Sequence, residues 1–262
     1  MLLTGGVALV LFLGAKINQF LTNPPLADLS EIKFRFSRKE ESAMPVVDVF
    51  FVTNRRPVAG RSGEFENGAG GSLSYGIAQI RMPAQLRVGD IQMPDIPRKI
   101  IDNQHAVILD VSVLTPEKFR AELSDRLTRL NSRTFDLFIH GINHSFDSAV
   151  RQAGTLSFDL DMPQPMVVFA WPTTPGILPG NYQSDLEQVT PASRQLANFL
   201  EAFQQDVHPE YMNVIAHSLG CKVACQTFDL IVREPAWQND ETKLSNIVLA
   251  APDVSREDFD KT

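Results

Sequence analysis

VIAHSLG, residues 214–220, decides the fold, because an apolar strand runs directly into a small-x-Ser-x-Gly turn and an apolar helix is predicted from residue 221. A sharp turn from strand to helix crowds its central residue, so the flanking residues must be small. Ala216 and Gly220 meet this need, although glycine is commoner than alanine at the first position. Such a turn exposes the Ser218 hydroxyl beside a helix N-terminus, whose positive end stabilises a developing oxyanion. The pattern predicts a nucleophile at Ser218; the alternative is a serine that only caps the helix.

Short apolar segments alternate with helical segments on both sides of this turn. Predicted strands cover residues 135–140, 166–171, 212–216 and 245–251, and predicted helices cover residues 147–160, 191–205 and 221–232. Strands that are apolar almost throughout indicate a parallel sheet covered on both faces, with right-handed crossovers. The fold class is therefore α/β, a mostly parallel sheet with helices on both faces.

The segment before this alternation is predicted to hold further strands and one helix. Residues 46–52 and 105–113 are rich in β-branched and aromatic side chains, and residues 73–82 are also compatible with a strand. Thr115 followed by Pro116 is typical of a helix start, and this helix is predicted to reach about residue 130. The glycine-rich residues 60–71 are predicted to form a loop, which is either a surface excursion or a flap near a site.

A second motif, HGIN at residues 140–143, follows the predicted strand at residues 135–140. Serine enzymes with a nucleophile on such a turn take one oxyanion donor from the amide after the serine, and another from the loop after an earlier core strand. The corresponding amides are those of Leu219 and Ile142. Gly141 would let this backbone approach a substrate closely.

Four further side chains are candidates for lining the site: His140, His144, Trp171 and His217. At the end of a strand, His140 is expected to be structural rather than the catalytic base. His144 either flanks the site or lies at a helix entry. Trp171 either lines an acyl pocket or is a buried core residue.

Five motifs occur in a familiar order: FFVTNRRP at 50–57, FIHGINHSFDSAV at 138–150, VVFAWP at 167–172, VIAHSLG at 214–220 and VLAAPDV at 248–254. The set resembles a bacterial α/β-hydrolase family of unknown function, described as esterase- or lipase-like. From about Val47 to the last residue, the resemblance implies an α/β-hydrolase fold and a carboxylic ester or lipid substrate. It also implies Ser218 as nucleophile and Asp253 as the acid that orients the base. The alternative for Asp253 is a cap of a following helix.

The resemblance departs from its pattern after Asp253, because triad order in this fold is serine, acid, then histidine. The residues that follow, VSREDFDKT, contain no histidine. We therefore expect a chain truncated before the catalytic histidine, lacking the last strands and the closing helix. A degenerate gene, or a divergent protein that uses another base, would produce the same ending. Impaired activity is expected, and the alternative function is a non-catalytic interaction module that retains the fold.

The first 45 residues are expected to lie outside the folded domain at residues 46–262. Residues 1–20 begin with fifteen uncharged residues, which suits a secretory signal or a membrane anchor, and residues 21–45 suit a linker. The alternative is a buried N-terminal helix. An exported or membrane-attached protein is favoured over a cytoplasmic one, with membrane association through residues 1–20.

Composition argues against several classes of partner. With 24 basic and 31 acidic residues the net charge is −7, so nucleic-acid binding is not expected. Cys221 and Cys225 are expected to be small packing residues on a helix rather than a disulfide or a zinc site. Residues 68–71 are not followed by a P-loop lysine, so no nucleotide cofactor and no metal are expected.

Overall fold

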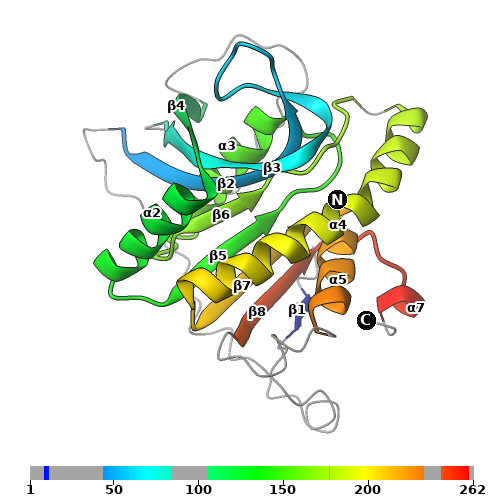
Figure 1. The fold of residues 1–262 in the computed structure, drawn as a ribbon. Helices are drawn as coiled ribbons and strands as arrows, with labels where there is room; N and C mark the ends of the chain where they lie inside the picture. The colour runs from blue at the N-terminus through cyan, green and yellow to red at the C-terminus, as the bar shows by residue number, and fades with distance from the viewer. Residues whose placement is uncertain (1–8, 12–43, 84–104, 177, 233–242, 260–262) are drawn as a thin grey trace, which may run out of the picture.

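The computed structural model describes residues 9–11, 44–83, 105–176, 178–232 and 243–259. The strands are β1 Leu9–Leu11, β2 Val46–Pro57, β3 Phe65–Arg81, β4 Val107–Leu114, β5 Thr134–Ile139, β6 Met166–Phe169, β7 Tyr211–His217 and β8 Lys243–Ala250. The helices are α2 Pro116–Arg129, α3 Phe146–Asp159, α4 Pro179–Val207, α5 Gly220–Ile231 and α7 Arg256–Phe259. These strands form one sheet in the order β1-β8-β7-β5-β6-β2-β3-β4 (Figure 1).

The central part of the sheet is parallel. Strands β2, β6, β5, β7 and β8 pair in parallel, whereas β3 and β4 are antiparallel additions on one side and β1 is an antiparallel addition to β8. The predicted mostly parallel sheet is therefore confirmed. Because parallel strands end at the same edge, the residues after β2, β5, β6, β7 and β8 meet there, which is where α/β proteins bind ligands.

Helices cover both faces of the sheet, as the alternating pattern predicted. In Figure 1, α2, α4 and α5 lie in front of the sheet and α3 lies behind it. The front layer packs its apolar side chains on alternate residues of β5 and β7, and the α3 layer packs on the opposite faces of β2, β5 and β6. Each fully buried large side chain contributes about 1.5–3 kcal/mol relative to an exposed one. These two cores hold the strand ends in place.

Two helices begin at residues whose side chains cap them. Thr115 precedes α2, and its hydroxyl accepts a hydrogen bond from the Lys118 N–H at 3.3 Å, which confirms the predicted helix start. Ser145 precedes α3 in the same way, accepting from the Ser148 N–H at 3.2 Å. The α3 cap also ends the loop that begins at His140, so the sequence between β5 and α3 is short and fixed at both ends.

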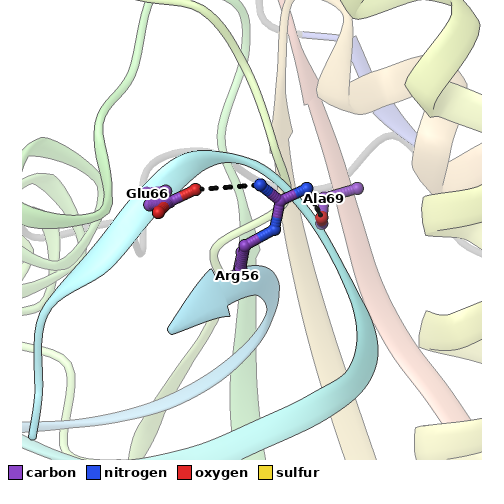
Figure 2. Close-up of polar contacts among 3 residues, drawn as sticks. All are labelled: Arg56, Glu66 and Ala69. Carbon is purple, nitrogen blue, oxygen red and sulfur yellow. Dashed lines mark hydrogen bonds and ion pairs between the residues drawn. The ribbon is translucent and has the colours of Figure 1, made fainter. Parts of the chain in front are cut away.

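The prediction of a loop over residues 60–71 is wrong from Phe65 onward. The glycine-rich segment forms the first part of β3 and pairs with β2, Pro57 with Phe65 and Arg55 with Ala69. In Figure 2, Arg56 spans this hairpin: its guanidinium lies 3.2 Å from the Glu66 carboxylate and donates to the Ala69 carbonyl at 3.4 Å. Pairing with an existing strand outweighs the low strand propensity of glycine.

The predicted start of the long helix at residue 191 is also wrong, because α4 begins at Pro179 and Pro191 lies inside it. An interior proline removes one backbone hydrogen bond and costs about 3 kcal/mol in an isolated helix. Here Val189, Ala192 and Leu196 are buried on both sides of the exposed Pro191, and their packing offsets this cost. The other predicted elements agree with the structure to within a few residues.

Most of the N-terminal segment lies outside the described residues. Leu9–Leu11 form β1 on the edge of β8, whereas residues 1–8 and 12–43 are not described, so the signal, anchor and linker interpretations stay predictions. No helix in the described part of the chain is long and apolar enough to cross a membrane.

Candidate active site

Ser218 occupies the turn between β7 and α5 in a conformation that non-glycine residues rarely adopt. Its φ is 51°, a left-handed value that costs about 1–3 kcal/mol and clusters at functional sites. Backbone contacts maintain it: the Ser218 N–H donates to the Ala250 carbonyl at 2.9 Å, and the Ser218 carbonyl accepts from the Cys221 N–H at 3.0 Å and from the Asp253 N–H at 3.1 Å. The half-buried Ser218 hydroxyl has no hydrogen-bond partner among the described residues. The turn therefore presents an unengaged hydroxyl at the carboxyl edge of the sheet.

Two glycines permit the close packing around this turn. A Cβ at position 141 would lie 2.8 Å from the Ser218 Cβ and 3.0 Å from the His217 carbonyl oxygen. A Cβ at position 220 would lie 2.4 Å from the His140 carbonyl oxygen. Both distances are shorter than carbon contacts allow, so glycine is required for space at each position. The loop after β5 thus lies directly against Ser218.

Two backbone N–H groups beside Ser218 are free to donate. Within the described residues, neither the Ile142 amide nor the Leu219 amide makes a hydrogen bond. Leu219 immediately precedes α5, so its amide lies at the positive end of that helix. Free donors beside an unengaged hydroxyl are what the stabilisation of an oxyanion requires.

Asp253, the predicted acid, lies in the loop after β8 and is joined to the same turn. Its N–H donates to the Ser218 carbonyl at 3.1 Å, and its Oδ2 accepts a hydrogen bond from the Tyr182 hydroxyl at 2.9 Å. The hydrogen bond to Asp253 raises the pKa of Tyr182. Helix α7 begins at Arg256, so Asp253 is not in the capping position for it. The described structure therefore joins the Asp253 backbone to the Ser218 backbone, while the Asp253 carboxylate is held by Tyr182.

His140 is fully buried behind the turn. Its Nδ1 lies 2.8 Å from the Gly141 carbonyl, which can only accept, so Nδ1 carries the proton. Its ring stacks on Trp171 at 5.7 Å, and the Trp171 Nε1–H donates to the His140 carbonyl at 2.8 Å. Burial, and then the proximity of His144 and Arg55, lower the pKa of His140 well below its usual range. The neutral His140 ring and the buried Trp171 ring thus hold the backbone of residues 140–141 through their hydrogen bonds.

The remaining site histidines do not engage Ser218. His144 Nδ1 lies 3.1 Å from the Ser148 hydroxyl, and burial lowers the pKa of His144 to about 4. His217 is half-buried, and burial lowers its pKa as well. Among the described residues no histidine hydrogen-bonds to Ser218 or Asp253. The described site brings together Ser218, the Ile142 and Leu219 amides and Asp253, without an imidazole hydrogen-bonded to Ser218 or Asp253.

Four further side chains at this edge were not predicted from the sequence: Arg55, Thr173, Tyr182 and Asp185. All three of Arg55, Thr173 and Asp185 are almost completely buried. Arg55 lies near the end of β2, Thr173 follows β6 and Asp185 lies on α4. A signal was present, since FFVTNRRP and WPTTP place polar residues directly after apolar strands. The carboxyl ends of β2 and β6 lie on the same edge as Ser218, so such runs point to the site.

The arrangement can perform attack of a hydroxyl on a carbonyl. It combines a strained serine, two free amides and a nearby carboxylate, which are the groups expected of acyl transfer. Within the described residues, no group of three or more histidine, cysteine, aspartate or glutamate side chains lies close enough to hold a metal ion.

Comparison with known proteins identifies one family. A family model described as an alpha/beta hydrolase of unknown function (DUF900) matches residues 115–262, which is more than half of the chain and includes the turn at Ser218, the loop at residues 140–144 and Asp253. No curated protein and no solved structure matches the chain.

Proposed function

The chain belongs to this family of alpha/beta hydrolases of unknown function, and on that premise we propose that it is a serine hydrolase acting on carboxylic esters or lipids. The observation that carries the proposal is the contact between the turn and the loop. Gly141 lies against a strained Ser218, and the Ile142 and Leu219 amides have no acceptor in the part of the chain that the structure describes. This geometry suits a tetrahedral intermediate formed at the serine hydroxyl.

The proposed reaction begins with attack of the Ser218 Oγ on the acyl carbonyl carbon. The carbonyl oxygen becomes negative and accepts hydrogen bonds from the Ile142 and Leu219 amides, while the Ser218 proton passes to a general base. Collapse of this intermediate breaks the ester bond, and the base returns the proton to the leaving alcohol. Water then attacks the acyl-enzyme, releasing the acid and restoring Ser218.

Asp253 is the residue that would orient the base. Its Oδ2 is held by the Tyr182 hydroxyl, and its backbone is fixed to the Ser218 carbonyl. A carboxylate held in this way can accept the N–H of an imidazole and stabilise the imidazolium that forms during attack. The described histidines do not occupy this position, so the identity of the base is the open step of the proposal.

Hydrolysis of a short p-nitrophenyl ester tests the proposal. The full chain, Ser218→Ala and the control Ser62→Ala should be compared after all three are shown to be folded. Ser62 is exposed in the β2–β3 turn, so its replacement removes a hydroxyl without touching the site. We expect Ser218→Ala to lower kcat by at least about 10³-fold, since the nucleophile is indispensable for this reaction. Equal turnover by all three proteins would overturn the proposal, whereas no turnover by any of them is the result expected if no base assists Ser218.

A further inference from the structure

Arg55 is a buried cation whose hydrogen bonds go to neutral groups. It follows the apolar part of β2 and is 0% exposed. Its Nη2 donates to the His144 carbonyl at 2.7 Å and reaches the Thr173 hydroxyl at 3.5 Å, and its Nη1 donates to the Asn67 side chain at 3.2 Å. In the described part of the chain no carboxylate lies within ion-pair distance of it. Burial of a charge without an ion pair is costly, so a specific role must compensate.

The carbonyl that Arg55 holds belongs to the end of the loop at Ser218. The Thr173 hydroxyl also binds both backbone groups of His144, accepting from its N–H at 3.1 Å and donating to its carbonyl at 2.8 Å. One residue earlier, the Asn143 side chain accepts a hydrogen bond from the Gly176 N–H. The segment 141–144 is therefore anchored from the ends of β2 and β6.

Asp185 on α4 completes this network. Its Oδ1 accepts from the Thr174 N–H at 2.8 Å, so α4 fixes the segment that carries Thr173. Burial lowers the pKa of Arg55 to about 9, while the charges of Asp185 and Asp147 act in the opposite direction. The guanidinium therefore remains charged at neutral pH, and a charged donor makes a stronger hydrogen bond to a carbonyl than a neutral one.

We propose that Arg55 is a positioning residue, which holds the His144 carbonyl and thereby keeps the Ile142 amide in place beside Ser218. The inference rests on the proposed function, because the loop matters for turnover only if Ser218 is the nucleophile. Arg55 does not contact substrate, since it is completely buried. Its effect passes through the backbone, and a misplacement of about 1 Å at a reacting centre costs about 100-fold in rate.

The test compares Arg55→Met and Arg55→Lys with Arg56→Met in the full chain. Arg56 is the matched control, because it is the next residue of β2 but is exposed, and its side chain bonds Glu66 and Ala69 across the hairpin (Figure 2). Hydrogen exchange of the peptide covering residues 141–146 reports on the loop, and the rate of Ser218 modification by a fluorophosphonate reports on the site. Thr173→Val is a second variant of nearly unchanged volume, which removes both hydroxyl contacts with His144.

For Arg55→Met we expect loop exchange to rise and Ser218 modification to slow by at least about tenfold, with partial recovery in Arg55→Lys; Arg56→Met should stay within twofold. If Arg55→Met unfolds, Thr173→Val should show the same two changes. Unchanged exchange and unchanged modification in a folded Arg55 or Thr173 variant would overturn the inference. A third outcome separates this inference from the proposed function. If Ser218 is not modified in any of the proteins but loop exchange still rises in Arg55→Met, the proposed function is contradicted, whereas the role of Arg55 in holding the loop is supported.

Discussion

Replacing Gly141 by alanine measures how closely the loop after β5 approaches Ser218, the proposed nucleophile. The backbone at Gly141 is not in the left-handed region, so the effect of a methyl group comes from space alone. The added Cβ would lie 2.8 Å from the Ser218 Cβ, whereas ordinary contacts begin at 3.4 Å, so the loop and the turn must separate by at least about 0.6 Å. Scaled from the rate loss of about 100-fold for 1 Å, this separation should slow reaction at Ser218 by about tenfold.

The assay is the second-order rate of fluorophosphonate modification, measured beside thermal unfolding. Gly68→Ala is the control, since its Cβ would meet nothing within 4 Å and its φ is also not positive. We expect Gly141→Ala to react about tenfold more slowly and to lose about 1–3 kcal/mol of stability, the usual cost of overpacking. A rate within twofold of the unmodified chain, with unchanged stability, would show that Gly141 does not lie this close to Ser218.

Three further predictions concern the rest of the core. Gly220→Ala should destabilise the chain by about 2 kcal/mol or more in a urea titration, because its Cβ would lie 2.4 Å from the His140 carbonyl oxygen. This overlap outweighs a helix-propensity gain of about 1 kcal/mol, and equal stability would contradict it. Burial raises the pKa of Asp136 from 3.8 to about 6, because the folded state favours the protonated carboxyl. The contribution of this preference to the free energy of unfolding is fully present below pH 4 and is lost as pH rises through 6. Asp136→Asn keeps an acceptor for Asn213 but cannot ionise, so it should raise the free energy of unfolding at pH 7 by up to about 3 kcal/mol. The change in this free energy between pH 4 and 6 should also become smaller. Urea titrations that give the same pH profile for both proteins would contradict this prediction. Burial raises the pKa of the Cys221 thiol to about 12 and that of the Cys225 thiol to about 11. Iodoacetamide at pH 8 should therefore alkylate both cysteines only after unfolding, as measured by mass spectrometry. Alkylation of the folded chain would show that the two thiols are not buried.

Local signals were sufficient to predict the turn and the strands around it. VIAHSLG places strand, serine and helix within a few residues, so its geometry depends on neighbours in the chain. The same holds for Thr115, whose capping contact with Lys118 spans three residues. The parallel sheet also followed from the sequence, because its strands are apolar almost throughout and alternate with helices.

Contacts between distant residues could not be predicted in this way. Arg55 meets His144 across 89 residues, and Tyr182 meets Asp253 across 71, and no local pattern fixes such pairs. The misplaced element boundaries have the same origin. Helix α4 continues past Pro191 because its neighbours pack on the core. Strand β3 extends into the glycine-rich segment because it pairs with β2. In both places tertiary contacts outweigh local propensity.

The most direct test of the central claim, that Ser218 is an activated nucleophile, is mapping of a fluorophosphonate adduct on the folded full chain by mass spectrometry. Trypsin releases Ser218 in the peptide of residues 195–222, which lies between Arg194 and the cleavage after Lys222. We expect one adduct, on Ser218, that is absent from Ser218→Ala and from the urea-unfolded chain. An adduct on a different residue, or none on the folded chain, would contradict it.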